Sequence, residues 1–229
     1  MSRRRAVLTT ALALLAAVLF AALGIWQVER LAWKRALIAR VDARLAAAPV
    51  PLPHRSGWAA LARTGEYARV RVVGTWLPGT PAFVQAVTDL GPGWWAIGAI
   101  RTVEGTVLVN RGFVAQDRRA AVAAPAGAAR VEGLVRRDEP GGGFLRRNDP
   151  AMDRWYSRDI AAIARRHRWR DPAPFFVDAD AVTDPAEPRG GLTVIRFPNN
   201  HLIYALTWFT LCGMALWFAW RIARRGIAA

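Results

Sequence analysis

The sequence predicts a membrane α+β protein. Two antiparallel transmembrane helices, one at each end of the chain, would flank a β-rich antiparallel sheet or small barrel with one or two helices. Residues 6–28 and 202–220 carry no charge, and each stretch has the roughly 20 apolar residues that a helix needs to cross a bilayer. The intervening loop of about 170 residues is long enough to enclose a core of its own.

The first apolar stretch follows "MSRRR", a short basic segment that we assign to a cytoplasmic tail, residues 1–5. A basic start before an apolar run is also the form of a secretory signal peptide. This run is longer than the apolar core of a usual signal, and no clear Ala-x-Ala cleavage site follows it. We therefore expect an uncleaved anchor over residues 6–28. Its helical spacing continues to about residue 47, where the prolines of "PVPLP" end it.

Residues 48–198 read mainly as short strands separated by turn residues. Pro78-Gly79 and Glu104-Gly105 predict two of the turns. Residues 159–168 predict a short helix, with Asp159 as its cap or in its first turn. The predicted strands are "YARVRVVGTW", "AFVQAV", "WWAIGAIRT", "TVLVNRGFV", "ARVEGLVRR", "PFFVDAD" and "LTVIRF".

The second transmembrane helix is expected over residues 199–220, followed by a cytoplasmic tail, residues 221–229. Six arginines flank the two helices on their outer sides, which favours both short tails in the cytoplasm. Without these six, 26 basic and 17 acidic residues remain, a net charge of +9. A basic domain at a membrane suits anionic lipids, acidic partners or propionate-bearing cofactors, although an arginine-rich composition explains the charge equally well.

Several classes of function are disfavoured by what the sequence lacks. Cys212 is the only cysteine, so no disulfide forms within the chain and cysteine-based redox or metal chemistry is excluded. No nucleic-acid-binding module is recognisable. No nucleophile elbow or paired-carboxylate motif is present either, which argues against an enzyme, although residues distant in sequence can still converge in space.

The candidate site lies where the end of the first apolar helix meets the start of the second. In an antiparallel pair, Trp26 and Gln27 should lie at the depth of His201. Helical spacing puts His201, Tyr204 and Trp208 on one face. A neutral imidazole is a good axial ligand for haem iron, and aromatic side chains can pack on a porphyrin. The alternative is an interfacial histidine within an ordinary aromatic belt, and spacing alone favours it.

Five motifs in order along the chain resemble those of the surfeit locus protein 1 family, which assists assembly of cytochrome c oxidase. They are "LGIWQVERLAWKRALI", "VRVVGTWLPG", "VLVNRGFV", "VEGLVRR" and "NNHLIYALTWFTL". The resemblance implies an assembly factor, not an enzyme. It implies a bacterial cytoplasmic (inner) membrane protein with both termini in the cytoplasm and the large domain in the periplasm. The implied partners are the catalytic oxidase subunit and haem a synthase, besides membrane lipids.

The resemblance also implies transient binding of haem a, with His201 as the axial ligand of its iron. Tyr204 and Trp208 match neighbouring positions of the closing motif. Trp26, Gln27 and Arg30 match the first-helix motif, and Arg30 and Arg196 are expected to pair with the propionates. Two other hypotheses remain: a cofactor-free scaffold that binds an oxidase subunit through its basic domain, and a membrane-anchored enzyme of unknown type.

Overall fold

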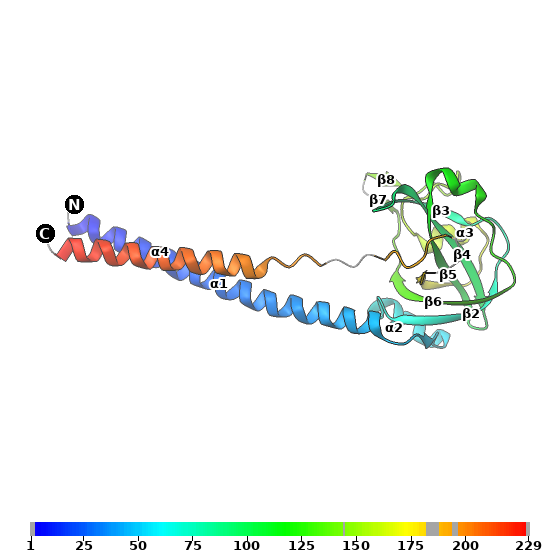
Figure 1. Ribbon diagram of the computed structural model, residues 1–229, viewed down its shortest axis with the longest axis horizontal. Coiled ribbons are helices and arrows are strands. Elements are labelled where there is room, and N and C mark those ends of the chain that lie inside the picture. The colour runs from blue at the N-terminus through cyan, green and yellow to red at the C-terminus, as the bar shows by residue number, and fades with distance from the viewer. Residues whose placement is uncertain (1–2, 144, 182–187, 194–196, 228–229) are drawn as a thin grey trace. The chain divides into compact units, whose positions relative to one another are not determined.

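A computed structural model describes residues 3–143, 145–181, 188–193 and 197–227 (Figure 1). The chain divides into two compact units: Met1–Val41 with Ile195–Ala229, and Asp42–Val194. Two long helices dominate the first unit, α1 (Arg3–Ala46) and α4 (His201–Ile227). Both are long and apolar enough to cross a membrane. The two apolar helices predicted at the chain ends are therefore confirmed.

Small residues, one glutamine and two aliphatic residues make up the buried face of α1. Between Ala17 and Leu31 its buried positions are separated by seven, three and four residues, the spacing that keeps one stripe facing a partner helix. On α4 the buried residues are Ala205 and Ala219, and small residues of this kind let two helix backbones approach closely. The buried residues of α1 within this unit are Ala6, Ala17, Gly24, Gln27, Leu31 and Val41.

The second unit is a β-barrel. Its seven-stranded sheet has the order β1-β2-β6-β9-β5-β4-β3, and β2 also pairs with β4 at Thr75–Arg101 and Trp76–Ile100, which closes five strands into a ring. The strands of the ring are β2 (Arg69–Trp76), β6 (Ala128–Arg137), β9 (Pro172–Ala179), β5 (Gly105–Ala115) and β4 (Gly91–Thr102). Two further strands extend the sheet: β1 (Val50–Pro51) and β3 (Ala82–Thr88).

Shorter elements complete the domain. The helices are α2 (Trp58–Thr64) and α3 (Ile160–Arg166), with 3-10 turns η1 (Arg55–Gly57) and η2 (Gln116–Ala121). β7 (Gly142–Gly143) and β8 (Arg146–Arg147) form a separate hairpin. Asp159 caps α3, because its Oδ1 accepts a hydrogen bond from the Ala162 N–H at 2.9 Å. The prediction of this capped helix is confirmed, whereas α2 carried too short an apolar pattern to be recognised.

The small barrel is confirmed, but the expectation of an antiparallel sheet is wrong for two strand pairs. β9 runs parallel to β5, and β1 runs parallel to β2. The chain passes through α3 before β9, and it returns to the end at which β5 begins, so β9 enters the ring in the same direction. The β4–β5 hairpin is confirmed, with Val103 and Glu104 in its turn and Gly105 already paired to Thr102.

The strand expected at "LTVIRF" is not found in its described part. Residues 192–193 and 197 are not in a strand, and residues 194–196 lie outside the described residues. The segment before them instead makes a single bridge, in which Arg189 exchanges two backbone hydrogen bonds with Phe113 of β5. Alternating apolar residues alone did not distinguish this connector from a strand.

Side chains on the barrel strands alternate between two cores. Inside the ring, Val107 and Val109 of β5 meet Phe175 and Val177 of β9, and Trp58 of α2 packs edge-on against Phe175. Outside the ring lies a second core. In it, Leu108 of β5 and Phe176 of β9 cluster with Ile163 of α3 and with two tryptophans on either side of that helix in sequence, Trp155 and Trp169. Both cores belong to the same strands because successive residues point to opposite faces.

A buried carboxylate joins three barrel strands. Asp178 of β9 is only 5% exposed, and it accepts hydrogen bonds from Asn110 Nδ2 of β5 at 2.8 Å and Arg136 Nη1 of β6 at 2.9 Å. Thr193 Oγ1 donates to it at 2.9 Å, and Arg158 Nη1 lies 3.5 Å away. A buried charge is tolerated when it is paired and hydrogen-bonded in this way. Asp178 therefore fixes the register where β5, β9 and β6 meet.

Two neighbouring acids respond to burial in opposite directions. Desolvation raises the pKa of Asp138, although the Ile160 N–H donates to it. Burial would also raise the pKa of Glu139, but hydrogen bonds from Arg158 and its charge outweigh that effect and lower the pKa. The ionised form of Glu139 is thus favoured by folding, and that of Asp138 is disfavoured.

Glu139→Gln should therefore make unfolding less sensitive to acid. Because the folded pKa of Glu139 is lowered, its contribution is complete above the unfolded value of 4.5 and is lost as the pH falls through the folded pKa. We expect the variant to lose about 1 kcal/mol at pH 7 and to match the wild type near pH 3. Urea unfolding at both pH values measures this. Asp138→Asn is the control and should be no less stable than the wild type at pH 7, since its raised pKa disfavours the folded state there.

Candidate functional site

His201 and Gln27 meet where the end of the apolar part of α1 lies against the start of α4. His201 Nδ1 lies 2.7 Å from Gln27 Oε1, although 174 residues separate the two in sequence. Gln27 is only 8% exposed, and His201 is half-buried. A buried amide in an apolar helix is costly unless it is hydrogen-bonded, so His201 satisfies Gln27 as much as Gln27 orients His201.

This hydrogen bond also determines which imidazole nitrogen is available. An amide oxygen can only accept, so with Gln27 Oε1 facing Nδ1 the proton resides on Nδ1. The lone pair is then on Nε2. Histidines that ligate metals commonly donate their other N–H to a carbonyl, which sets the tautomer and fixes the ring. The pair therefore has the same hydrogen-bond arrangement as a metal-ligating histidine and its supporting acceptor.

Aromatic contacts hold the two helices together beside this pair. Phe20 of α1 stacks on Trp208 of α4, with ring centroids 5.7 Å apart and planes at 25°. Gly24 lies one turn before Gln27, and a Cβ at this position would be 2.6 Å from Cε1 of Phe209. Any larger residue at position 24 would require the Phe209 ring to move, because the ring occupies the space of a side chain. The three contacts, 27 with 201, 24 with 209 and 20 with 208, also show that α1 and α4 run antiparallel.

The structure brings together only part of the predicted set. Gln27 and His201 are in contact, and Trp208 lies on the same helix interface. Tyr204 and Trp26 do not reach it, since they are 54% and 53% exposed. Tyr204 is displaced because the interface of α4 follows positions 201, 205 and 208, which leaves 204 on its flank. Of the three residues predicted to share one helical face, His201 and Trp208 therefore lie at the contact with α1, and Tyr204 lies beside it.

Of the two arginines predicted to pair with the propionates, one lies outside the contact between α1 and α4, and the other lies outside the described residues. Arg30 is exposed, with its guanidinium carbon 4.2 Å from the centroid of the Trp33 ring. Arg196 lies outside the described residues. Lys34 Nζ lies 5.2 Å from the Phe197 ring, an additional cation near the start of α4. Asn199, two residues before the start of α4, has a buried Oδ1 with no hydrogen-bond partner among the described residues.

The donor set suits a metal that brings most of its own ligands. The described residues contain no group of three or more histidine, cysteine, aspartate or glutamate side chains that could hold a metal ion. One imidazole is too few for a bare ion such as zinc, which takes three or four protein ligands. It is sufficient for haem iron, to which the porphyrin supplies four nitrogens. His201 and Gln27 therefore fit an axial ligand and its support.

Gly24→Leu should separate the two helices, because its side chain would collide with Phe209. We expect loss of the Gln27–His201 contact and much lower cross-linking between cysteines placed at Phe20 and Trp208. Treating the purified protein with a short thiol cross-linker in a Cys212→Ser background measures this. Gly213→Leu on α4 is the matched control, since a Cβ there would meet nothing within 4 Å. Equal cross-linking in the two leucine variants would show that the close approach at Gly24 is unimportant.

Comparison with known proteins places the site within a family. Residues 14–213 match the family model described as the SURF1 family, and this range includes both Gln27 and His201. Surfeit locus protein 1 of Rattus norvegicus is 33% identical over 86% of this chain and 70% of its own length. The SURF1-like protein of Monosiga brevicollis is 34% identical over 89% and 82%, respectively. Surfeit locus protein 1 of Homo sapiens is 31% identical over 86% and 72%.

Proposed function

The chain belongs to the SURF1 family, and on that premise we propose that it is an assembly factor for cytochrome c oxidase, not an enzyme. We propose that it binds haem a through His201 at the junction of α1 and α4. Its role is then to deliver haem a to the catalytic subunit of the oxidase or to retain it there. The observation that carries this proposal is the 2.7 Å contact between His201 Nδ1 and Gln27 Oε1.

In this proposal the protein contributes binding and orientation. Haem a, as cargo, brings the iron and four of its ligands. His201 offers the Nε2 lone pair, and Gln27 holds the ring in the tautomer that leaves this lone pair available. Arg30, exposed at one turn beyond Gln27, supplies positive charge for a propionate. A single protein ligand suits a carrier, because a cargo held by one bond can be released to the next protein.

The membrane placement follows from the same two helices. We propose that both span the bacterial cytoplasmic membrane, with the termini in the cytoplasm and the barrel domain in the periplasm. The arginines at 3–5 and at 221, 224 and 225 support this orientation, since basic residues are retained on the cytoplasmic side. The catalytic oxidase subunit and haem a synthase are then partners that share the same membrane.

Co-purification of the oxidase separates haem delivery from a cofactor-free scaffold. The catalytic subunit should co-purify both with the wild type and with His201→Ala, but the subunit held by the variant should contain much less haem a. Haem extraction and chromatography of the captured complex measure this. His167→Ala, in the barrel domain, is the matched control. An equal haem a content in the subunit captured by all three proteins would support the scaffold and contradict haem delivery.

A further inference from the structure

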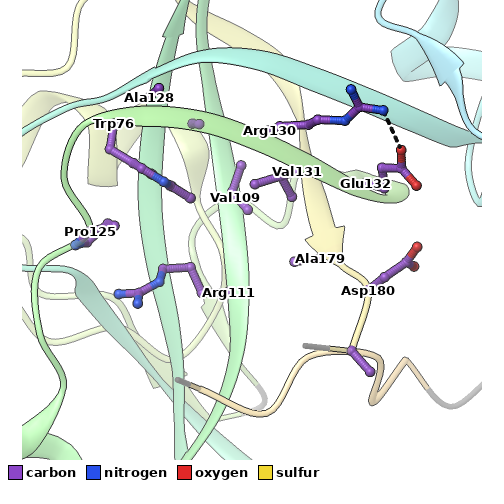
Figure 2. A pocket seen from close by; sticks show the side chains of 12 residues that line it. Trp76, Val109, Arg111, Pro125, Ala128, Arg130, Val131, Glu132, Ala179 and Asp180 are labelled. Atoms are coloured by element: carbon purple, nitrogen blue, oxygen red, sulfur yellow. Dashed lines mark ion pairs between the residues drawn. The ribbon is translucent and has the colours of Figure 1, made fainter. Parts of the chain in front are cut away.

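The barrel has an open end that the haem proposal does not use. A cavity of about 590 Å³ lies there, entirely within the second unit (Figure 2). We call it the barrel mouth and define it by its lining, which comes from the end of β2, the middle of β5, the start of β6 and the end of β9. Its volume is within the range of small-molecule sites, and the mouths of β-barrels are common places for them. The lining used in the argument is Trp76, Val109, Arg111, Ala129, Arg130 and Val131.

The distribution of side-chain sizes inside the ring explains why this end is open. Away from the mouth, Trp58 of α2 packs edge-on against Phe175, and both belong to the buried cluster inside the ring. At the mouth, the inward positions of β6 and β9 carry Ala129 and Ala179. Small barrels are normally filled by their own side chains, so alanines at inward positions leave volume for another molecule.

The wall of the barrel mouth is apolar on one side and basic on the other. Trp76, Val109 and Val131 provide the apolar surface (Figure 2). Arg111 follows Val107 and Val109 at the next inward position of β5, where the strand pattern would place another apolar residue. It is 8% exposed, and its Nη1 donates to the Ala123 carbonyl oxygen at 2.8 Å, which ties the guanidinium to the connection before β6.

The rim carries both signs of charge, with Arg130 beside two acids, Glu132 and Asp180. The Arg130 side chain is 67% exposed, and its Nη2 lies 3.7 Å from Glu132 Oε1. That carboxylate makes its shorter contact, 2.7 Å, with Arg71 Nε. The other rim acid, Asp180, is ion-paired with Arg69. Glu132 and Asp180 are therefore already paired with arginines of β2. The long, exposed contact of Arg130 with Glu132 can be replaced by a contact with a ligand anion at little cost in free energy.

We propose that the barrel mouth binds an amphipathic organic anion. The apolar body of the ligand would lie against Trp76, Ala129 and Val131, and its acid group would pair with Arg130 at the rim. The inference is independent of the haem site, because every residue that it uses is in the second unit. It assigns the barrel domain a ligand of its own, held by burial of apolar surface and by one charge-assisted contact.

Calorimetry with naphthalene-2-sulfonate as the probe tests this proposal. The full chain in zwitterionic nanodiscs is titrated, with empty nanodiscs as the blank and 2-naphthol as the neutral probe. We expect saturable 1:1 binding that prefers the sulfonate. Ala128→Trp should weaken it at least about tenfold, because the indole would occupy the mouth from its exposed edge. Ala181→Trp changes another lining residue and provides a second variant if the first does not fold.

Matched arginine variants test the charge. Arg130→Gln should weaken sulfonate binding roughly fivefold and abolish the preference over 2-naphthol. Arg137→Gln, an exposed arginine on the same strand but outside the mouth, should bind like the wild type. The proposal is overturned if no saturable binding exceeds that of empty nanodiscs, or if folded tryptophan variants bind like the wild type. A sulfonate preference that persists in Arg130→Gln overturns the anion assignment.

Discussion

Purified His201→Ala protein is expected to contain less than about one tenth of the haem found in the wild type when both are produced in cells that make haem a. The alanine removes the only described side chain at the helix junction with an available nitrogen lone pair. Gln27 then also loses its hydrogen-bond partner in a buried position. Loss of one axial ligand worth 1.4 kcal/mol or more lowers occupancy by at least tenfold under subsaturating conditions.

The absorption spectrum of detergent-purified protein, normalised to protein concentration, measures this loss. His167→Ala is the matched control. That histidine is held by Asp153 at 3.1 Å and stacks on Trp169, and it lies in the barrel domain. Its replacement should leave the haem content unchanged. Full haem retention in His201→Ala would contradict the assignment of the axial ligand.

Asp178→Ala is expected to lower the free energy of unfolding of the barrel domain by about 3–5 kcal/mol. The substitution leaves two arginines, Arg136 and Arg158, with side chains 17% and 16% exposed and without their shared carboxylate. It also removes the acceptor for Asn110 of β5, which is itself buried. A loss of this size is a large fraction of the stability of a typical domain.

Urea unfolding followed by tryptophan fluorescence measures this effect, because Trp58, Trp155 and Trp169 lie in the two cores. Asp180→Ala is the control on the same segment of chain. Its carboxylate pairs with Arg69 at a partly exposed position, so its loss should cost no more than about 1 kcal/mol. Similar unfolding curves for the two alanine variants would show that the Asp178 network is not what secures the three strands.

The parts of the fold that could be predicted from the sequence are those whose signals lie within a short stretch of the chain. Apolar helices and alternating strands such as β2 and β5 are visible in short windows of sequence. The parallel entry of β9 between β5 and β6 is not, because it depends on where the chain returns after α3. The Asp178 network was missed for the same reason, since Asn110, Arg136 and Arg158 come from three separate segments.

The candidate site was partly predictable for a physical reason. Antiparallel helices place residues of equal depth side by side, which is why Gln27 could be expected near His201. The exact interface could not be deduced, because it depends on how each helix is rotated. Gly24 was a visible signal: a glycine one turn before Gln27 is typical of a close helix contact. Its partner Phe209 and the stacking of Phe20 on Trp208 become evident only in the structure.

Chemical rescue of His201→Gly by imidazole tests the central claim most directly, because it separates ligation of the iron from support of the helix pair. The variant has the space of the missing ring, so added imidazole can supply the nitrogen that the chain has lost. The absorption spectrum of the purified variant, titrated with haem a with and without imidazole, is the measurement. Recovery of the wild-type haem spectrum with imidazole, and not with an equal concentration of acetamide, is the predicted result. Wild-type haem binding by the variant without imidazole, or no recovery when it is added, would contradict His201 as the ligand.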